Sequence, residues 1–184
     1  GEPAMLSAGD GPLGVVFLNE ADNDMCAWLD YATALSKDHR VAIWDYTDPS
    51  GSLQDTTTEL TSVITRVRAA GAERVALVGG SRGGCFTLLH ASRTPEIAGA
   101  VVLSCARVWN RLDPTDLAPH LPKVHQPVLS IIGEKDPDVP ADEARTDLHL
   151  LGSTDKDLVV LAGEPGHGVD LLASDEVTSR IDEF

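Results

Sequence analysis

The stretch RVALVGGSRGGC (residues 74–85) decides how the whole chain is interpreted. A continuous apolar run leads into a glycine-rich turn around Ser81, and a helical pattern begins at Gly83. Such a run predicts a buried strand, and Gly-x-Ser-x-Gly between a strand and a helix predicts a sharp, strained turn. Gly79 and Gly83 leave room for the strand and the helix to pass close together. The turn would hold the serine hydroxyl clear of the sheet, beside helix N–H groups that favour a developing negative charge.

The segments around this stretch alternate between short apolar runs and helical patterns. Strands are expected at residues 14–19, 40–45, 74–80, 98–105, 126–133 and 157–163, and helices at 24–37, 53–71, 83–93, 141–151 and from 169 onward. Because the apolar runs do not alternate with polar residues, they predict a parallel sheet covered on both faces. We expect an α/β fold: a doubly wound, mostly parallel sheet of six to seven strands. The length of 184 residues predicts one domain over 1–184, in which 1–12 are a tag remnant or reduced first strands.

Composition narrows the class of protein and of partner. The chain is 42% hydrophobic with a net charge of −15, which is typical of a globular protein and argues against binding to nucleic acid or to anionic membranes. Cys26, Cys85 and Cys105 lie in apolar stretches without metal-ligand spacing, so each is expected to be a buried free thiol. This favours a reducing, cytoplasmic location, with a removed secretion signal as the alternative.

A serine hydroxyl becomes a nucleophile only when a base takes its proton, and that base needs a carboxylate to orient it. In doubly wound sheets these groups follow the carboxyl ends of later strands. GEKDPDVP (residues 133–140) follows the fifth predicted strand and offers Glu134, Asp136 and Asp138. GEPGHG (residues 163–168) follows the sixth and carries His167 between two glycines. The other five histidines fall in helical or linking stretches, where surface or packing roles are expected.

With VGGSRGG, GEKDPDVP and GHG each placed after its strand, nearly the whole chain resembles the α/β-hydrolase superfamily, and within it the small bacterial dienelactone hydrolases and esterases. The resemblance implies that Ser81 is the nucleophile and His167 the general base and acid. It implies Asp136 as the orienting carboxylate, with Asp138 and then Glu134 as alternatives. It also implies an oxyanion hole made of backbone N–H groups.

The oxyanion hole is expected to use the N–H of Arg82 and that of Ala21 or Glu20. Many relatives have His-Gly where this chain has Asn19-Glu20-Ala21. A carboxylate facing the oxyanion would be unfavourable, so Glu20 is expected to point to solvent or to pair with Arg82. Asn19 and Trp109 are candidate residues of the substrate pocket.

The predicted function is hydrolysis of small carboxylic esters through an acyl-enzyme, with no metal and no organic cofactor, by a monomer or homodimer. Only residues 106–125 separate the fourth and fifth predicted strands, which leaves room for one short helix at 115–123 and for no cap domain. Three alternatives stay open: thioester hydrolysis or acyl transfer, a biosynthetic tailoring step on the same residues, and a catalytically silent binding protein.

Overall fold

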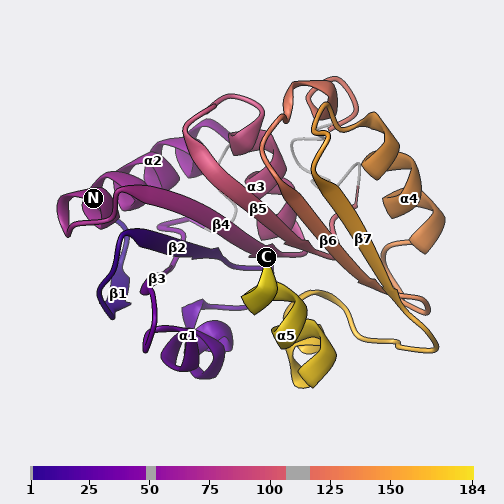
Figure 1. The fold of residues 1–184 in the computed structure, drawn as a ribbon, viewed down its shortest axis with the longest axis horizontal. Coiled ribbons are helices and arrows are strands. Elements are labelled where there is room, and N and C mark those ends of the chain that lie inside the picture. Colours follow the sequence, from indigo (N-terminus) through magenta and orange to yellow (C-terminus); the bar gives the residue numbers. More distant parts are fainter. Residues whose placement is uncertain (1, 49–52, 107–116) are drawn as a thin grey trace.

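One twisted sheet organises the molecule (Figure 1), and the computed structural model describes residues 2–48, 53–106 and 117–184. The strand order is β1-β3-β2-β4-β5-β6-β7. The strands are β1 (Met5–Ala8), β2 (Leu13–Leu18), β3 (Arg40–Trp44), β4 (Arg74–Gly80), β5 (Ile97–Leu103), β6 (Val128–Gly133) and β7 (Lys156–Leu161). All neighbours pair in parallel except β1, which pairs antiparallel with β3. The predicted doubly wound, mostly parallel sheet is therefore confirmed.

Helices cover both faces of the sheet (Figure 1). The α-helices are α1 (Leu29–Leu35), α2 (Leu53–Ala69), α3 (Arg82–Ala91), α4 (Ala141–Leu150) and α5 (Asp175–Glu183), and the 3₁₀ helices are η1 (Met25–Trp28), η2 (Leu121–Lys123) and η3 (Gly168–Ala173). Helices α2, α3 and α4 lie on one face, whereas α1 and α5 lie on the other. No helix within the described residues is long and apolar enough to cross a membrane.

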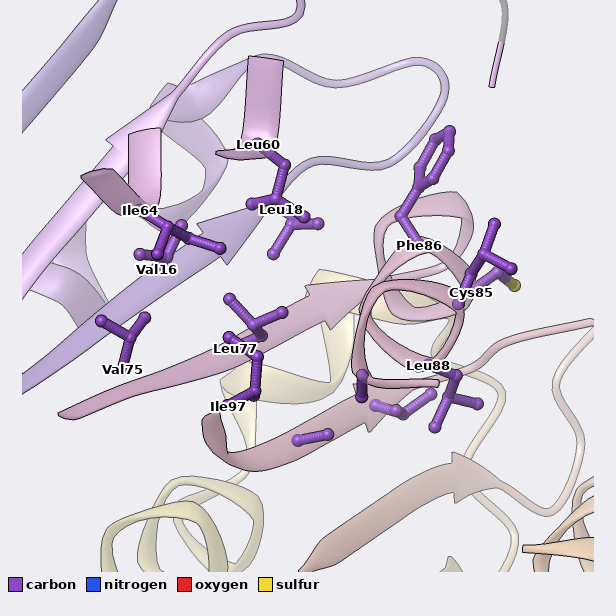
Figure 2. Close-up of a cluster of buried hydrophobic side chains, with 14 of the residues drawn as sticks. Val16, Leu18, Leu60, Ile64, Val75, Leu77, Cys85, Phe86, Leu88 and Ile97 are labelled. Carbon is purple, nitrogen blue, oxygen red and sulfur yellow. The ribbon is translucent and has the colours of Figure 1, made fainter. Parts of the chain in front are cut away.

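Two apolar layers hold these helices to the sheet, because successive strand residues face opposite sides. Val16 and Leu18 of β2 pack towards α2 and α3 (Figure 2), whereas Val15 and Phe17 pack towards α1 and α5. The predicted apolar face of α2, which consists of Leu60, Val63, Ile64 and Val67, is buried in the first layer. Strands buried on both faces explain the continuous apolar runs in the sequence.

The C-terminal segment differs from the single helix expected from residue 169 onward. It consists of η3 and α5, separated at Ser174, whose φ of −92° and ψ of 124° are extended. Ser174 precedes Asp175 and Glu176, which lie in the first turn of α5, and serine followed by acidic residues is a common start for a new helix. Of the helix expected at 115–123, only 121–123 are helical, as η2, and 118–120 form a turn; residues 107–116 lie outside the described residues.

The cysteines also differ from the prediction of three buried free thiols. Cys85 on α3 and Cys105 after β5 form a disulfide, with their Cα atoms 5.2 Å apart, and Cys26 is exposed. Helix α3 packs against β5 and thereby brings together two residues that are 20 positions apart in the sequence. The bridge therefore ties the helix that follows Ser81 to the end of the neighbouring strand.

Candidate active site

Ser81 occupies a strained turn between β4 and α3, near the middle of the sheet. Its φ of 48° and ψ of −119° lie in a region that residues with side chains rarely adopt, at a typical cost of about 1–3 kcal/mol. A Cβ atom at Gly79 would overlap the backbone of Gly83, and one at Gly83 would overlap the carbonyl oxygen of Leu18. The two glycines thus permit the close approach that the sequence predicts.

The first residues of α3 follow the strained serine directly. The Ser81 N–H donates to the carbonyl of Leu103 over 2.7 Å, which fixes the turn to the end of β5. The Ser81 hydroxyl is half-buried and forms no hydrogen bond with any other residue in the described part of the chain. In enzymes without bound substrate such contacts are often long and tighten when the substrate binds.

Arg82 begins α3, but its side chain is not the solvated group that a helix start would suggest. It is buried, and its guanidinium carbon lies 5.1 Å from the ring centre of Tyr46 and 5.2 Å from that of Phe86. A guanidinium over aromatic faces is a favourable cation–π arrangement. This packing holds the side chain among the rings and fixes the start of the helix at the turn.

His167 and Asp136 are brought together from the loops after β7 and β6. The Nδ1 atom of His167 lies 3.0 Å from Oδ1 and 2.9 Å from Oδ2 of Asp136. The Asp136 side chain is fully buried, and that of His167 is 19% exposed. Gly168 places this histidine beside the serine turn, since a Cβ atom on Gly168 would lie 3.4 Å from the Ser81 nitrogen. An imidazole held by a buried carboxylate next to a strained serine is the arrangement that acyl-transfer enzymes use.

The pKa values of the pair are shifted in opposite directions. The hydrogen bond that His167 donates to Asp136 raises the pKa of His167 against the opposing effect of burial, and the charges of Asp136, Glu20 and Asp138 raise it further. Burial alone would raise the pKa of Asp136, but the bond to His167 and two backbone N–H bonds bring it below its ordinary value. Asp136 therefore stays ionised, and the imidazole is a stronger base than a free one.

Asp138 and Glu134, the alternatives to Asp136 as the orienting carboxylate, have different hydrogen-bond partners. Asp138 is exposed, and its backbone N–H donates to Asp136 Oδ1 over 2.9 Å. Glu134 accepts a hydrogen bond from the N–H of Gly163 over 2.7 Å. Asp136, Asp138 and His167 are the one group among the described residues whose ligand atoms, all within 4.8 Å, could hold a metal ion. The hydrogen bond between Asp136 and His167 accounts for this grouping without an ion.

The loop after β2 lies against the serine turn, where the second half of the oxyanion hole was expected. A Cβ atom at Gly83 would lie 2.7 Å from the carbonyl oxygen of Asn19, so the loop and the start of α3 are in contact. Neither Glu20 nor Ala21 donates its backbone N–H to another described residue. Within the described residues, these two N–H groups are therefore left without a protein acceptor.

The proposed pocket residues are not equally placed. Asn19 is 1% exposed, and its amide donates to the carbonyl of Trp44 and to Asp45. Its side chain therefore ties the loop after β2 to the end of β3. Trp109 lies outside the described residues. Leu117, in the segment between β5 and β6, is fully buried.

Glu20 departs most clearly from its expected orientation. The expectation that its carboxylate points to solvent is wrong, because the residue is only 6% exposed. Its Oε1 atom accepts from the N–H of Val169 over 2.8 Å, and Oε2 accepts from the amide of Asn23. The pKa of Glu20 is raised overall, mainly by burial and further by the charges of Asp22 and Asp170. The hydrogen bond from Val169 and the charge of His167 act in the opposite direction and lower it. A buried carboxylate therefore belongs to the site.

Ser104 is a residue of the site that the sequence analysis did not identify. It directly follows β5, has a φ of 57° and is 2% exposed. Its buried hydroxyl lies near Asp136 and lowers the pKa of that carboxyl. The hydroxyl makes no hydrogen bond to another described residue. Its position at the carboxyl end of a central strand was the one signal available in the sequence.

Comparison with known proteins identifies a family. The sequence profile of the dienelactone hydrolase family matches residues 31–160. This range includes Ser81 and Asp136 and ends before His167. A search of curated protein sequences finds no match.

Solved structures of α/β-hydrolases share the fold. An α/β-hydrolase from a metagenome of lagoon sediments at Mar Chica, Morocco, is 21% identical with a TM-score of 0.82, covering 100% of this chain and 94% of its own. The enol-lactonase of Burkholderia xenovorans is 15% identical with a TM-score of 0.81, over 98% and 95% of the two chains. A thermophilic esterase from Thermogutta terrifontis is 16% identical with a TM-score of 0.81, over 98% and 92%.

Proposed function

Since this chain belongs to the dienelactone hydrolase family, whose members are hydrolases of the α/β type, we propose that it cleaves small carboxylic esters with Ser81, His167 and Asp136 as its catalytic residues. The hydrogen bond between His167 and Asp136, next to a serine in a strained turn, is the observation that carries this proposal. The open N–H groups at Glu20 and Ala21 add to it.

In the proposed reaction, Asp136 accepts the Nδ1–H of His167 and so leaves Nε2 free to take the proton of Ser81. The Ser81 oxygen then attacks the ester carbonyl. The oxyanion that forms is bound by the N–H of Arg82 and by that of Ala21 or Glu20. His167 returns the proton to the leaving alcohol, and an acyl-enzyme remains.

Water completes the cycle by the same route. His167 removes a proton from the water molecule, whose oxygen attacks the acyl carbonyl, and the collapse of the second tetrahedral species returns the proton to Ser81. The products are a carboxylic acid and an alcohol. Every proton in the cycle is carried by the one imidazole of His167.

A fluorophosphonate probe tests this proposal, because it reacts with activated serines and leaves ordinary ones untouched. We expect mass spectrometry to find the label on Ser81 alone, and Ser81→Ala to be neither labelled nor active on a short ester. Ser92→Ala is the matched control, since Ser92 lies at the opposite end of α3 from Ser81 and its hydroxyl donates to the carbonyl of Leu89. A label on Ser104, or on no serine at all, would contradict the proposal.

A further inference from the structure

The carboxylate of Glu20 connects two segments that are far apart in the sequence. Glu20 follows β2, and its Oε1 atom accepts the N–H of Val169, a residue 149 positions later in η3. The first N–H groups of a helix have no partner within that helix, so they depend on an acceptor from elsewhere. Here Glu20 supplies that acceptor, and His167 is the residue that directly precedes η3.

Gly168 shows how closely the carboxylate fits. Its φ is +52°, and a Cβ atom on it would overlap Oε1 of Glu20. On the other side, a Cβ atom on Gly80 would lie 3.1 Å from the same oxygen. The carboxylate thus lies between the end of β4, where the serine turn begins, and the residue next to the catalytic histidine. Glycine on both sides leaves the space that it occupies.

The charges around this carboxylate come from several segments. Asp22 lies in the same loop and Asp170 in η3, while His167 faces it from the loop after β7. His167 in turn faces Asp136 and Asp138 as well as Glu20. Because the imidazole gains a proton during acyl transfer, a neighbouring carboxylate stabilises the charged ring. The same charge would oppose the oxyanion, but its lone pairs are engaged by Val169 and Asn23.

We infer that Glu20 is a positioning residue: its carboxylate holds the His167 loop against the serine turn through the Val169 N–H, and its charge favours the protonated imidazole. This inference rests on the proposed function, because it assigns work to Glu20 only if His167 is the base. It replaces the view of Glu20 as a surface residue of the oxyanion loop. It also gives a reason for glycine at position 168, which must be small for the carboxylate to fit.

Two substitutions separate the hydrogen bond from the charge. Glu20→Gln keeps an oxygen for the Val169 N–H and removes the charge, whereas Glu20→Ala removes both. We expect kcat for a short ester to stay within about tenfold of the wild type in Glu20→Gln. In Glu20→Ala, where the loop loses its anchor, we expect a fall of about 100-fold, as for small misplacements of catalytic groups. In both variants the acid limb of the kcat/KM profile should move to lower pH.

Asp22→Asn is the matched control, since it removes the same charge from an exposed residue of the same loop. If Asp22→Asn moved the acid limb as far as Glu20→Gln does, net charge and not Glu20 would be responsible. If Glu20→Ala kept the kcat of Glu20→Gln, the anchoring role would be wrong. Should Glu20→Ala not fold, the pH profile of Glu20→Gln still decides, because an unmoved limb would overturn the charge role.

Labelling by fluorophosphonate separates this inference from the proposed function. A wild-type protein labelled at Ser81, together with a Glu20→Ala variant that is labelled equally fast, would overturn the role of Glu20 and leave the function standing. A wild-type protein that is not labelled would overturn the proposed function, and the inference with it. The expected result is rapid labelling of the wild type, similar labelling of Glu20→Gln and slow labelling of Glu20→Ala.

Discussion

Replacing Asp136 by asparagine should inactivate the protein by reversing the tautomer of His167. The Oδ1 atom of Asp136 accepts two backbone N–H groups, from Asp138 and Val139, each over 2.9 Å. In Asp136→Asn these bonds keep the remaining oxygen at the Oδ1 position, so the new NH₂ group takes the place of Oδ2. That group would face Nδ1 of His167 at the site of the present 2.9 Å contact, whereas the remaining oxygen, 3.0 Å from Nδ1, is already engaged by the two backbone N–H groups.

The tautomer of His167 depends on whether the group opposite Nδ1 accepts or donates a hydrogen bond. An NH₂ group opposite Nδ1 requires Nδ1 to accept, which places the imidazole proton on Nε2, where it cannot take the proton of Ser81. The Asp136 side chain is fully buried, so the new NH₂ group cannot turn to bulk solvent instead. A loss of about 10⁴-fold in kcat is expected for this change, which corresponds to about 5.5 kcal/mol in the activation barrier.

The assay is the pH profile of kcat and kcat/KM for a short 4-nitrophenyl ester, with far-UV circular dichroism to verify the fold. Asp138→Asn is the matched control, because Asp138 contributes its backbone N–H and not its side chain to the buried carboxylate. We expect this control to stay within tenfold of the wild type. If Asp138→Asn were the inactivating change and Asp136→Asn were tolerated, the reasoning would be refuted.

Three further outcomes are expected. The contacts of His167 raise its pKa, and the neutral imidazole is the form that can act as the base. Wild-type kcat/KM should therefore fall on the acid side with an apparent pKa above the ordinary 6.5. An acid limb at or below 6.5 would contradict this environment of His167. Reduction of the Cys85–Cys105 bridge should lower the free energy of unfolding by about 3 kcal/mol, which thermal melts with and without reductant would detect, and equal melting temperatures would exclude the bridge. Gly83→Ala should cost about 1–3 kcal/mol in chemical unfolding, because its Cβ atom would overlap the carbonyl oxygen of Leu18, and a neutral effect would contradict the tight turn.

The sheet and its helices could be predicted from the sequence because burial on both faces leaves a strong pattern. The runs at β4 and β6, for example, are apolar without alternation, and glycine marks the end of each. The edge strand β1 was harder to identify, since it has only four residues, from Met5 to Ala8, and they are mostly exposed. The break at Ser174 was missed because apolar residues continue on both sides of it, although a serine before Asp175 and Glu176 is a helix-start signal.

The positions of Ser81, Asp136 and His167 could be predicted because each follows a strand whose carboxyl end meets the same edge of the sheet. The contact between His167 and Asp136 follows from that topology. The Cys85–Cys105 bridge could not be predicted, because it depends on how closely α3 packs against β5. Ser104 was missed for a related reason: nothing in its neighbours indicates a left-handed backbone at a residue with a side chain.

Glu20 shows where reasoning from the loop alone reaches its limit. Considered only with its neighbours in the sequence, a glutamate beside an oxyanion hole is unfavourable, and turning it outward is the simplest solution. The structure contains a different solution, in which the Val169 N–H and the Asn23 amide bind the carboxylate and the small residue Gly168 makes room for it. That arrangement requires a left-handed glycine and a free N–H group on a segment more than 140 residues away, and neither is visible in the sequence around Glu20. If His167 is the base, a buried acid is tolerated next to the developing negative charge because its hydrogen bonds position that base.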